Sequence, residues 1–229
     1  MARRDAPDSY GLITRTAPEL LHRVGRPSDT IYFSEISPDV DADPEAGNRF
    51  DVLGGGVTYA ATKPKAALLE TLQKFTPHTE TIAAVQRLQP DQMVLGNLPA
   101  NWRDTHRMKT FQIADALPFV DIEDPRTHRA LDRELAGDLA GFGVPKLNIS
   151  VVRDDKDRRV TRAIATWAYL AQDGDGDYLY SGIRYLSKIE NLECWAIFDG
   201  VRLENVVSKY VPKDALFYEA CSCLAIHPQ

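Results

Sequence analysis

The stretch GGGVTYAATKPKAALLETL, residues 54–72, decides the fold of this chain. Its three glycines indicate a turn or a close approach of the backbone, and the β-branched and aromatic residues of Val57–Ala61 predict a strand. Thr62 is a good helix N-cap, and Pro64 is tolerated in a first helical turn, where its missing N–H is not needed. The stretch therefore predicts a strand that leads directly into a helix.

Strands and helices mix without regular order on both sides of this unit. The expected strands are Ile31–Ile36, Ile82–Leu88, Gln92–Leu98, Lys109–Ala114, Tyr178–Tyr180 continuing into Gly182–Tyr185, and a hairpin of Leu192–Phe198 and Val201–Tyr210 around Asp199-Gly200. The other expected helices are Arg126–Gly141, Arg159–Gln172 and Asp214–Leu224. Without a βαβ rhythm, repeat or linker, we predict one α+β domain over residues 20–229, with a mixed, mostly antiparallel β core flanked by helices. Residues 1–19 are polar and are expected to form a flexible, loosely attached lead-in.

The composition is typical of a globular chain and excludes several classes. Among 229 residues, 44% are hydrophobic and 26% charged, which excludes a disordered or collagen-like protein. Lys and Arg number 27 against 33 Asp and Glu, and the net charge of −6 disfavours direct nucleic-acid binding. The three cysteines suggest no disulfide framework, and we find no signal peptide or membrane-spanning run. We therefore expect a cytoplasmic protein without membrane attachment.

Several familiar motifs are imitated but incomplete. The Asp173–Asp177 run resembles a calcium loop, but Tyr178 and Arg184 stand where that loop needs a glycine and a glutamate. The glycines at 54–56 lack the spacing of a dinucleotide fingerprint, and the five histidines lack metal-ligand spacing. A Gly-Xaa-Ser-Xaa-Gly motif is missing, which disfavours a common serine hydrolase. We expect no metal and no resident cofactor.

Five polar residues on otherwise apolar segments remain as candidates for a site. They are Arg23, Arg49, Tyr59, Glu70 and Ser187. Glu70 lies opposite the apolar stripe of its helix, so taken alone it is interpreted as a solvent-facing residue; the stripe is Leu68, Leu72 and Phe75. Tyr59 alone is equally typical of a strand core, and Ser187 of a strand end. None of the five is specific by itself.

Taken together, these residues lie in motifs that resemble the RES-domain family, named for its Arg, Glu and Ser residues. The motifs are Leu21-His22-Arg23-Val24, Gly47-Asn48-Arg49-Phe50-Asp51, Val57-Thr58-Tyr59-Ala60-Ala61-Thr62, Ala66-Ala67-Leu68-Leu69-Glu70-Thr71-Leu72, Gly182-Ile183-Arg184-Tyr185-Leu186-Ser187 and Cys194-Trp195-Ala196-Ile197-Phe198. The resemblance spans about residues 20–200. In two respects the chain departs from the family: Asn48 stands where small residues are usual, and an inserted helical segment near 120–172 helps to separate Glu70 from Ser187.

The resemblance implies a fold similar to that of ADP-ribosyltransferase toxins and an enzyme that consumes NAD as its substrate. Studied members cleave the nicotinamide–ribose bond by phosphorolysis or hydrolysis, or transfer ADP-ribose to a protein. Many are toxins paired with a helix-turn-helix antitoxin protein. Carried over by motif, Glu70 and Arg49 are expected to be catalytic, and Arg23, Tyr59 and Ser187 to bind substrate. Inorganic phosphate is a candidate co-substrate, and a homodimer is left open.

These residue types suit that chemistry. Cleavage of the nicotinamide–ribose bond proceeds through an oxocarbenium-like state, which a carboxylate such as Glu70 stabilises. Arg23 and Arg49 can hold the NAD diphosphate, or an attacking phosphate, through bidentate contacts. Tyr59 could stack on the nicotinamide or the adenine ring of NAD. Ser187 could form a hydrogen bond with the nicotinamide amide or a ribose hydroxyl. We expect an NAD phosphorylase, slightly ahead of an NAD glycohydrolase; a protein ADP-ribosyltransferase and a non-catalytic binding module are the alternatives.

Overall fold

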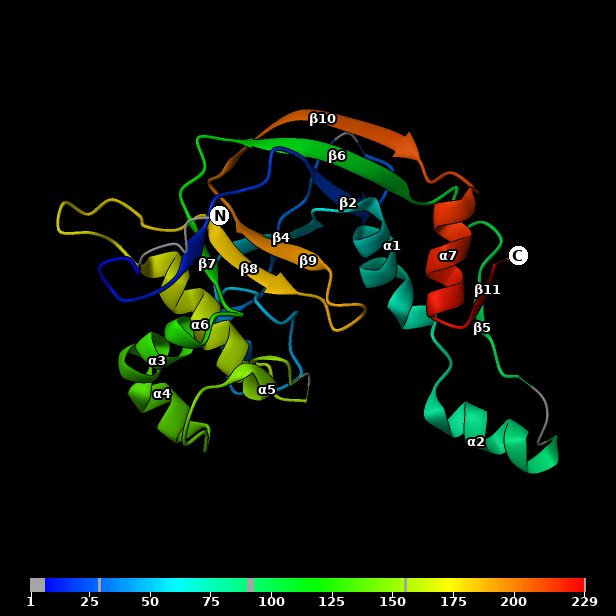
Figure 1. Cartoon of the computed structure of the whole chain (residues 1–229), viewed down its shortest axis with the longest axis horizontal. Helices are drawn as coiled ribbons and strands as arrows, with labels where there is room; N and C mark the ends of the chain where they lie inside the picture. The colour runs from blue at the N-terminus through cyan, green and yellow to red at the C-terminus, as the bar shows by residue number, and fades with distance from the viewer. Residues whose placement is uncertain (1–6, 29, 90–92, 155, 229) are drawn as a thin grey trace, which may run out of the picture.

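A nine-stranded sheet forms the centre of the molecule (Figure 1). The computed structural model describes residues 7–28, 30–89, 93–154 and 156–228. In pairing order, the strands are β1 (Thr14–Arg15), β7 (Phe119–Asp121), β8 (Gly182–Leu186), β9 (Glu193–Phe198), β4 (Gly56–Ala61), β2 (Leu21–Gly25), β6 (Arg107–Ala114) and β10 (Arg202–Tyr210), with β3 (Ser34–Glu35) also on β4. Within the described sheet, β7 and β8 alone pair in parallel. The predicted mixed, mostly antiparallel core is confirmed.

Helices surround this sheet, as expected for an α+β domain. They are α1 (Pro64–Leu72), α2 (Thr79–Leu88), α3 (Pro125–Glu134), α4 (Ala136–Gly141), α5 (Ile149–Val152), α6 (Arg159–Leu170) and α7 (Ala215–Cys223), with 3-10 turns η1 (Pro38–Val40) and η2 (Gln73–Phe75). In Figure 1, α3 to α6 gather near β7 and β8, whereas α1 packs against β2 and α7. Of the helices in the described ranges, none has the length and apolar character needed to cross a bilayer.

The strand and helix predicted from residues 54–72 form as β4 and α1. β4 pairs with β9 along its length, in the middle of the sheet. α1 begins at Pro64, but its N-cap is Lys63, which makes no side-chain cap bond, rather than Thr62. The Thr62 hydroxyl instead donates to Glu193 Oε2 on β9 at 2.7 Å. Thr62 therefore fixes the start of the helix to the neighbouring strand.

The segment Ile82–Leu88 is a helix, and its prediction as a strand is wrong. It forms most of α2, in which no described side chain is buried. The apolar residues Ile82, Val85 and Leu88 recur every three positions, which is a helical spacing. A window this short contains too few repeats to separate the two periods.

Three other expected strands are shorter than predicted or absent. Within Ile31–Ile36 the strand is Ser34–Glu35, and within Gln92–Leu98 it is β5 (Gly96–Leu98), which pairs in parallel with β11 (Ile226–Pro228). Gln92 lies outside the described residues. Tyr178–Tyr180 forms no strand and contributes one isolated bridge, from Tyr178 to Gln172. A strand extends only as far as it pairs with a neighbouring strand. The sequence of a single segment does not show how long that neighbour is.

The expected hairpin around Asp199-Gly200 is also wrong. Both strands exist, and Gly200 turns the chain with φ of +84°. β9, however, pairs with β4 and β8, whereas β10 pairs with β6 at the edge of the sheet. β9 is almost wholly buried and β10 is largely exposed, so the two strands have different environments and do not pair with each other.

The three other predicted helices form with adjusted ends. Arg126–Gly141 is divided into α3 and α4 by Leu135, whose φ of −109° and ψ of 20° interrupt the helix. Arg159–Gln172 ends two residues early, as α6. Asp214–Leu224 forms α7, with the Asp214 side chain accepting from Phe217 N as the N-cap.

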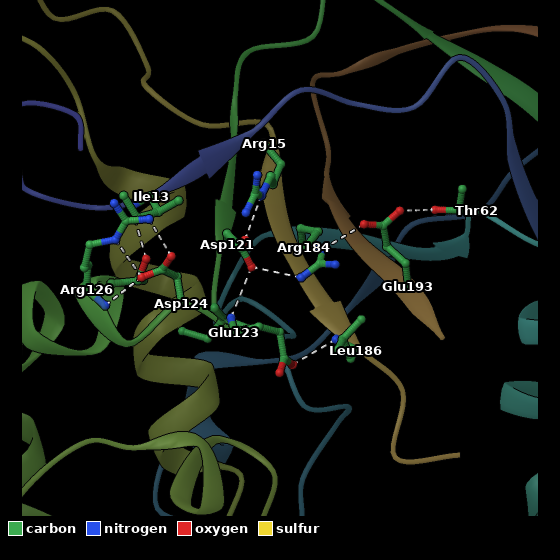
Figure 2. A network of polar contacts seen from close by, with 12 residues as sticks. Ile13, Arg15, Thr62, Asp121, Glu123, Asp124, Arg126, Arg184, Leu186 and Glu193 are labelled. Atoms are coloured by element: carbon green, nitrogen blue, oxygen red, sulfur yellow. Dashed lines mark hydrogen bonds and ion pairs between the residues drawn. The ribbon is translucent and has the colours of Figure 1, made fainter. Parts of the chain in front are cut away.

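Residues 12–15 are built into the sheet or its core. Leu12 and Ile13 are fully buried, and β1 pairs with β7. Figure 2 shows Arg15 in a polar network that crosses the sheet: its Nε donates to Asp121 Oδ2 at 2.8 Å, and Arg184 Nη1 donates to Asp121 Oδ1 at 3.1 Å. Because Asp121 is 2% exposed, it needs such partners. The expectation of a loosely attached lead-in is therefore wrong for residues 12–15; residues 1–6 lie outside the described ranges.

Candidate active site

A pocket of about 480 Å³ opens where β2 and β4 separate. The two strands share one register pair, His22↔Ala61, so the sheet is almost divided at this point. The charged side chains that line the pocket are Arg23, Arg49, Arg158 and Lys188, against Glu70. Cations outnumber carboxylates, which suits an anionic ligand.

Glu70 lies on α1 and lines this pocket. Five residues of α1 are buried, which leaves the Glu70 side as the side that opens to the pocket; they are Ala66, Ala67, Leu68, Leu69 and Leu72. Glu70 Oε1 accepts a 2.5 Å hydrogen bond from Ser187 Oγ. The structure therefore brings together two candidates that are 117 residues apart in the sequence, and Glu70 is not the free solvent-facing residue that its position suggests alone.

Ser187 touches Glu70 rather than the open part of the pocket. The residue follows β8, is 1% exposed, and its Oγ also accepts from Ile189 N at 3.0 Å. A hydroxyl can donate one hydrogen bond, and Ser187 donates its hydrogen bond to Glu70. Figure 2 shows how the end of β8 is fixed, because Leu186 N donates to Glu123 Oε1 at 2.9 Å. Ser187 is thus placed to orient Glu70, which differs from the expected direct bond to substrate.

Arg49 lies in the loop before β4, and its guanidinium is held from two sides. Its Nη2 donates to the carbonyl of Val152, the last residue of α5, at 3.1 Å. Its Cζ lies 5.1 Å from the ring centroid of Phe50 and 5.2 Å from that of Tyr185. Arg49 Nε is buried and has no acceptor among the described residues. The guanidinium plane is therefore oriented while part of its hydrogen-bonding capacity is unused.

Arg23 approaches the same pocket from β2. Its Nη1 donates to the Tyr59 carbonyl at 2.8 Å, across the gap between β2 and β4. Burial lowers the pKa of Arg23, although a guanidinium keeps its charge in proteins. Arg23 reaches the pocket from β2 and Arg49 from the loop before β4, and together they place two positive charges in it.

The hydroxyl of Tyr59 is committed to Asp51. It donates to Asp51 Oδ1 at 2.7 Å and accepts from Phe50 N at 3.1 Å. Burial, with Asp51 beside it, raises the pKa of Tyr59 well above its ordinary value, so the group stays protonated. Asp51 also accepts from Asn48 N at 2.7 Å, which fixes the turn that carries Arg49. Only the ring face of Tyr59 is left for a ligand, while Asn48 has a structural role.

Further residues belong to the pocket or its wall and were not singled out as candidates in the sequence. Those with a charged or phenolic side chain include Asp51, Arg158, Tyr185 and Lys188. Tyr185 and Lys188 stand two residues before and one after Ser187, so proximity to a candidate was an available signal. Arg158, the N-cap residue of α6, gave no such signal, because its approach depends on how α6 packs back toward the loop before β4.

Neither thiol nor metal chemistry is indicated near the pocket. Cys194 on β9 is buried, and burial together with the nearby Glu70 raises its pKa, so it remains a thiol and not a nucleophilic thiolate. In the described ranges, no group of three or more His, Cys, Asp or Glu side chains could hold a metal ion.

Comparison with known proteins supplies the family. A search of curated proteins finds no match. A family model, the RES domain, matches residues 20–216 of the 229-residue chain. The matched range contains all five predicted site residues, together with β2, β4, β8 and α1. The chain belongs to the RES domain family.

Proposed function

We propose that this chain is an enzyme that cleaves the nicotinamide–ribose bond of NAD. The observation that carries the proposal is the Glu70 carboxylate, held by Ser187 in a pocket lined by arginines. The RES domain is broadly associated with NAD-utilising enzymes, which agrees with this chemistry.

Glu70 is the group proposed to stabilise the reaction. As the bond to nicotinamide breaks, positive charge grows on the ribose, and a carboxylate close to the ring lowers the energy of that state. Such a carboxylate must already be oriented, because reorientation during the reaction would reduce the benefit. The 2.5 Å bond from Ser187 supplies this orientation. Nicotinamide leaves as a neutral base, so the proposal needs no general acid.

The arginines are proposed to bind the diphosphate of NAD. Arg49 has a buried Nε without an acceptor in the described residues, and arginine forks match phosphate oxygens. The pocket is lined by four cationic side chains, Arg23, Arg49, Arg158 and Lys188, against one carboxylate, Glu70. This excess favours inorganic phosphate as the second substrate, with nicotinamide and ADP-ribose 1″-phosphate as products. Water and a protein side chain are the other acceptors to be compared.

Product analysis tests the proposal directly. Purified protein is incubated with NAD, with and without phosphate, and the products are identified by mass. Phosphorolysis gives the phosphorylated sugar, hydrolysis gives free ADP-ribose, and a transferase leaves ADP-ribose covalently bound to protein. If nicotinamide is released in none of the three reactions, the proposed activity is wrong.

The variant Glu70→Gln tests the role of the carboxylate. It preserves size and removes charge, so we expect turnover to fall about 10²–10³-fold while the fold persists. Glu80→Gln, at an exposed position of α2, is the control and should retain the parent rate. We also propose that the chain acts as a toxin, in which case the parent and not Glu70→Gln should deplete NAD in cells and arrest their growth. Parental turnover by Glu70→Gln would remove Glu70 from the mechanism.

A further inference from the structure

Arg158, the N-cap residue of α6, and Arg162 within α6 hold the acidic loop that precedes Arg49. Arg162 Nη2 donates to the carbonyls of Asp41 and Asp43, and its Nη1 to the carbonyl of Ala46, each at 2.8 Å. One turn earlier, Arg158 N donates to the Pro44 carbonyl at 2.8 Å. The Arg158 side chain donates to the carbonyls of Glu45, at 2.8 Å, and Gly47. Almost every residue from 41 to 47 is thus bound to α6 through its main chain.

Arg162 is an unusual residue for such a contact. It is 0% exposed, its Nε has no acceptor in the described residues, and its hydrogen bonds go to carbonyl oxygens rather than to a carboxylate. Burying a guanidinium that makes no hydrogen bond to a carboxylate in the described residues is costly, and here its hydrogen bonds to three loop carbonyls offset that cost. Bonds to carbonyls fix the path of the backbone. These features favour a role in positioning over a role in stability.

Because α6 holds residues 41–47, it also fixes the backbone position of Arg49, which follows them. Gly47 has φ of +64°, and a Cβ there would lie 2.8 Å from Asp51 Oδ2, so the backbone turns sharply beside that carboxylate. Asp51 then binds Asn48 N, and Arg49 follows. The guanidinium of Arg49 rests on the carbonyl of Val152, in the same inserted segment. Both the backbone and the side chain of Arg49 are therefore supported by residues 125–170.

We propose that Arg162 is a positioning residue, which acts through residues 41–47 to place Arg49 for the diphosphate of NAD. This inference rests on the proposed function of the pocket. The inference gives the helical segment of residues 125–170 a role in the site. α5 and α6 support Arg49, whereas α1 and the end of β8 support Glu70. Losing Arg162 should then weaken substrate binding more than it slows the chemical step.

Steady-state kinetics of Arg162→Lys and Arg162→Gln test the direction of the effect. Each variant loses the planar fork, so we expect the KM for NAD to rise about 10–100-fold, with kcat within about threefold of the parent. The matched control is Arg159→Gln, on the same helix, because Arg159 is 30% exposed and pairs locally with Asp157. The control should keep the parent KM. A fall in kcat with an unchanged KM would overturn the proposal.

A double-mutant cycle separates positioning from general damage. If Arg162 acts through Arg49, Arg162→Lys should add little in an Arg49→Lys background, because the residue that it places has already lost its fork. Independent effects that multiply in the double variant would refute the proposal, since a merely structural role acts on any background.

Hydrogen exchange provides a readout that needs no NAD. In the parent the amides of residues 40–48 should be protected, and in Arg162→Lys they should exchange faster, while the amides of β8 and β9 keep their protection. This result would stand even if NAD were not the substrate, so it distinguishes failure of this inference from failure of the proposed function. Unchanged exchange over residues 40–48 would show that Arg162 does not hold the loop.

Discussion

Removing the hydroxyl of Ser187 is the sharpest test of how Glu70 is oriented. In Ser187→Ala, Glu70 loses the 2.5 Å donor to Oε1, and Ile189 N loses its acceptor at 3.0 Å. A hydrogen bond to a charged group contributes about 1.5–3 kcal/mol. If that contribution is realised in the transition state, it corresponds to a fall in kcat of about 10–150-fold, at 1.36 kcal/mol per tenfold. The KM for NAD should change little, because the arginine contacts persist.

The assay is release of nicotinamide over a range of NAD concentrations. Ser181→Ala is the matched control: Ser181 is also buried, at 3% exposed, and its hydroxyl accepts from Leu117 N at 2.8 Å, outside the pocket lining. Ser181→Ala loses one hydrogen bond of a buried hydroxyl and Ser187→Ala loses two, so both variants should lose thermal stability, Ser187→Ala somewhat more. Only Ser187→Ala should lose turnover. A kcat within twofold of the parent would refute the idea that Ser187 orients Glu70.

Two further predictions concern stability. Tyr59→Phe removes the hydroxyl that donates to Oδ1 of the 1%-exposed Asp51, so the free energy of unfolding should fall by about 1–3 kcal/mol in denaturant titrations, and no measurable change would contradict this assignment. Asp124→Ala removes the N-cap of α3 and should cost about 1 kcal/mol at pH 7. Hydrogen bonds from Arg126 lower the pKa of Asp124 below its ordinary value of 3.8, so its contribution is present above that value and lost as the pH falls through the lowered pKa. Unfolding measured at pH 7 and at pH 3 should therefore show the difference between parent and variant shrinking in acid; a constant difference would argue against the ion pair.

Local chemistry made part of the fold predictable. β4 and α1 follow from β-branched residues and from Pro64 at the first helical turn, which act within a few positions. Strand pairing does not follow in this way. The turn at Gly200 is present, yet β10 takes β6 as its neighbour, because pairing depends on which strand the chain leaves open elsewhere. Leu12 and Ile13 were likewise misjudged, since a short apolar pair in a polar stretch does not indicate what will cover it.

Most residues of the candidate site could be predicted to lie near one another, but their hydrogen bonds could not, and their roles in a reaction stay predictions. Motif order indicated the residues that meet in the pocket, including Glu70 and Arg49. The partner of the Ser187 proton was not predictable, because a hydroxyl bonds to whatever acceptor the fold brings near. Arg158 was missed for the same reason. Its bonds go to main-chain carbonyls of a loop more than a hundred residues earlier, and carbonyls carry no sequence signal.

The narrow contact between β2 and β4 makes the sheet behave as two leaves joined along a seam. One leaf is β2, β6 and β10, and the other contains β4 with β9, β8, β7 and β1. At the seam, His22↔Ala61 is the one register pair, and beside it Arg23 reaches across to the Tyr59 carbonyl where a ladder bond would otherwise lie. A ligand that contacts Arg23 on β2 and also Arg49, whose guanidinium packs against Tyr185 of β8, would bridge the two leaves. Its binding energy would then add to the cohesion of the folded sheet, so occupancy of the pocket and resistance to unfolding should rise together.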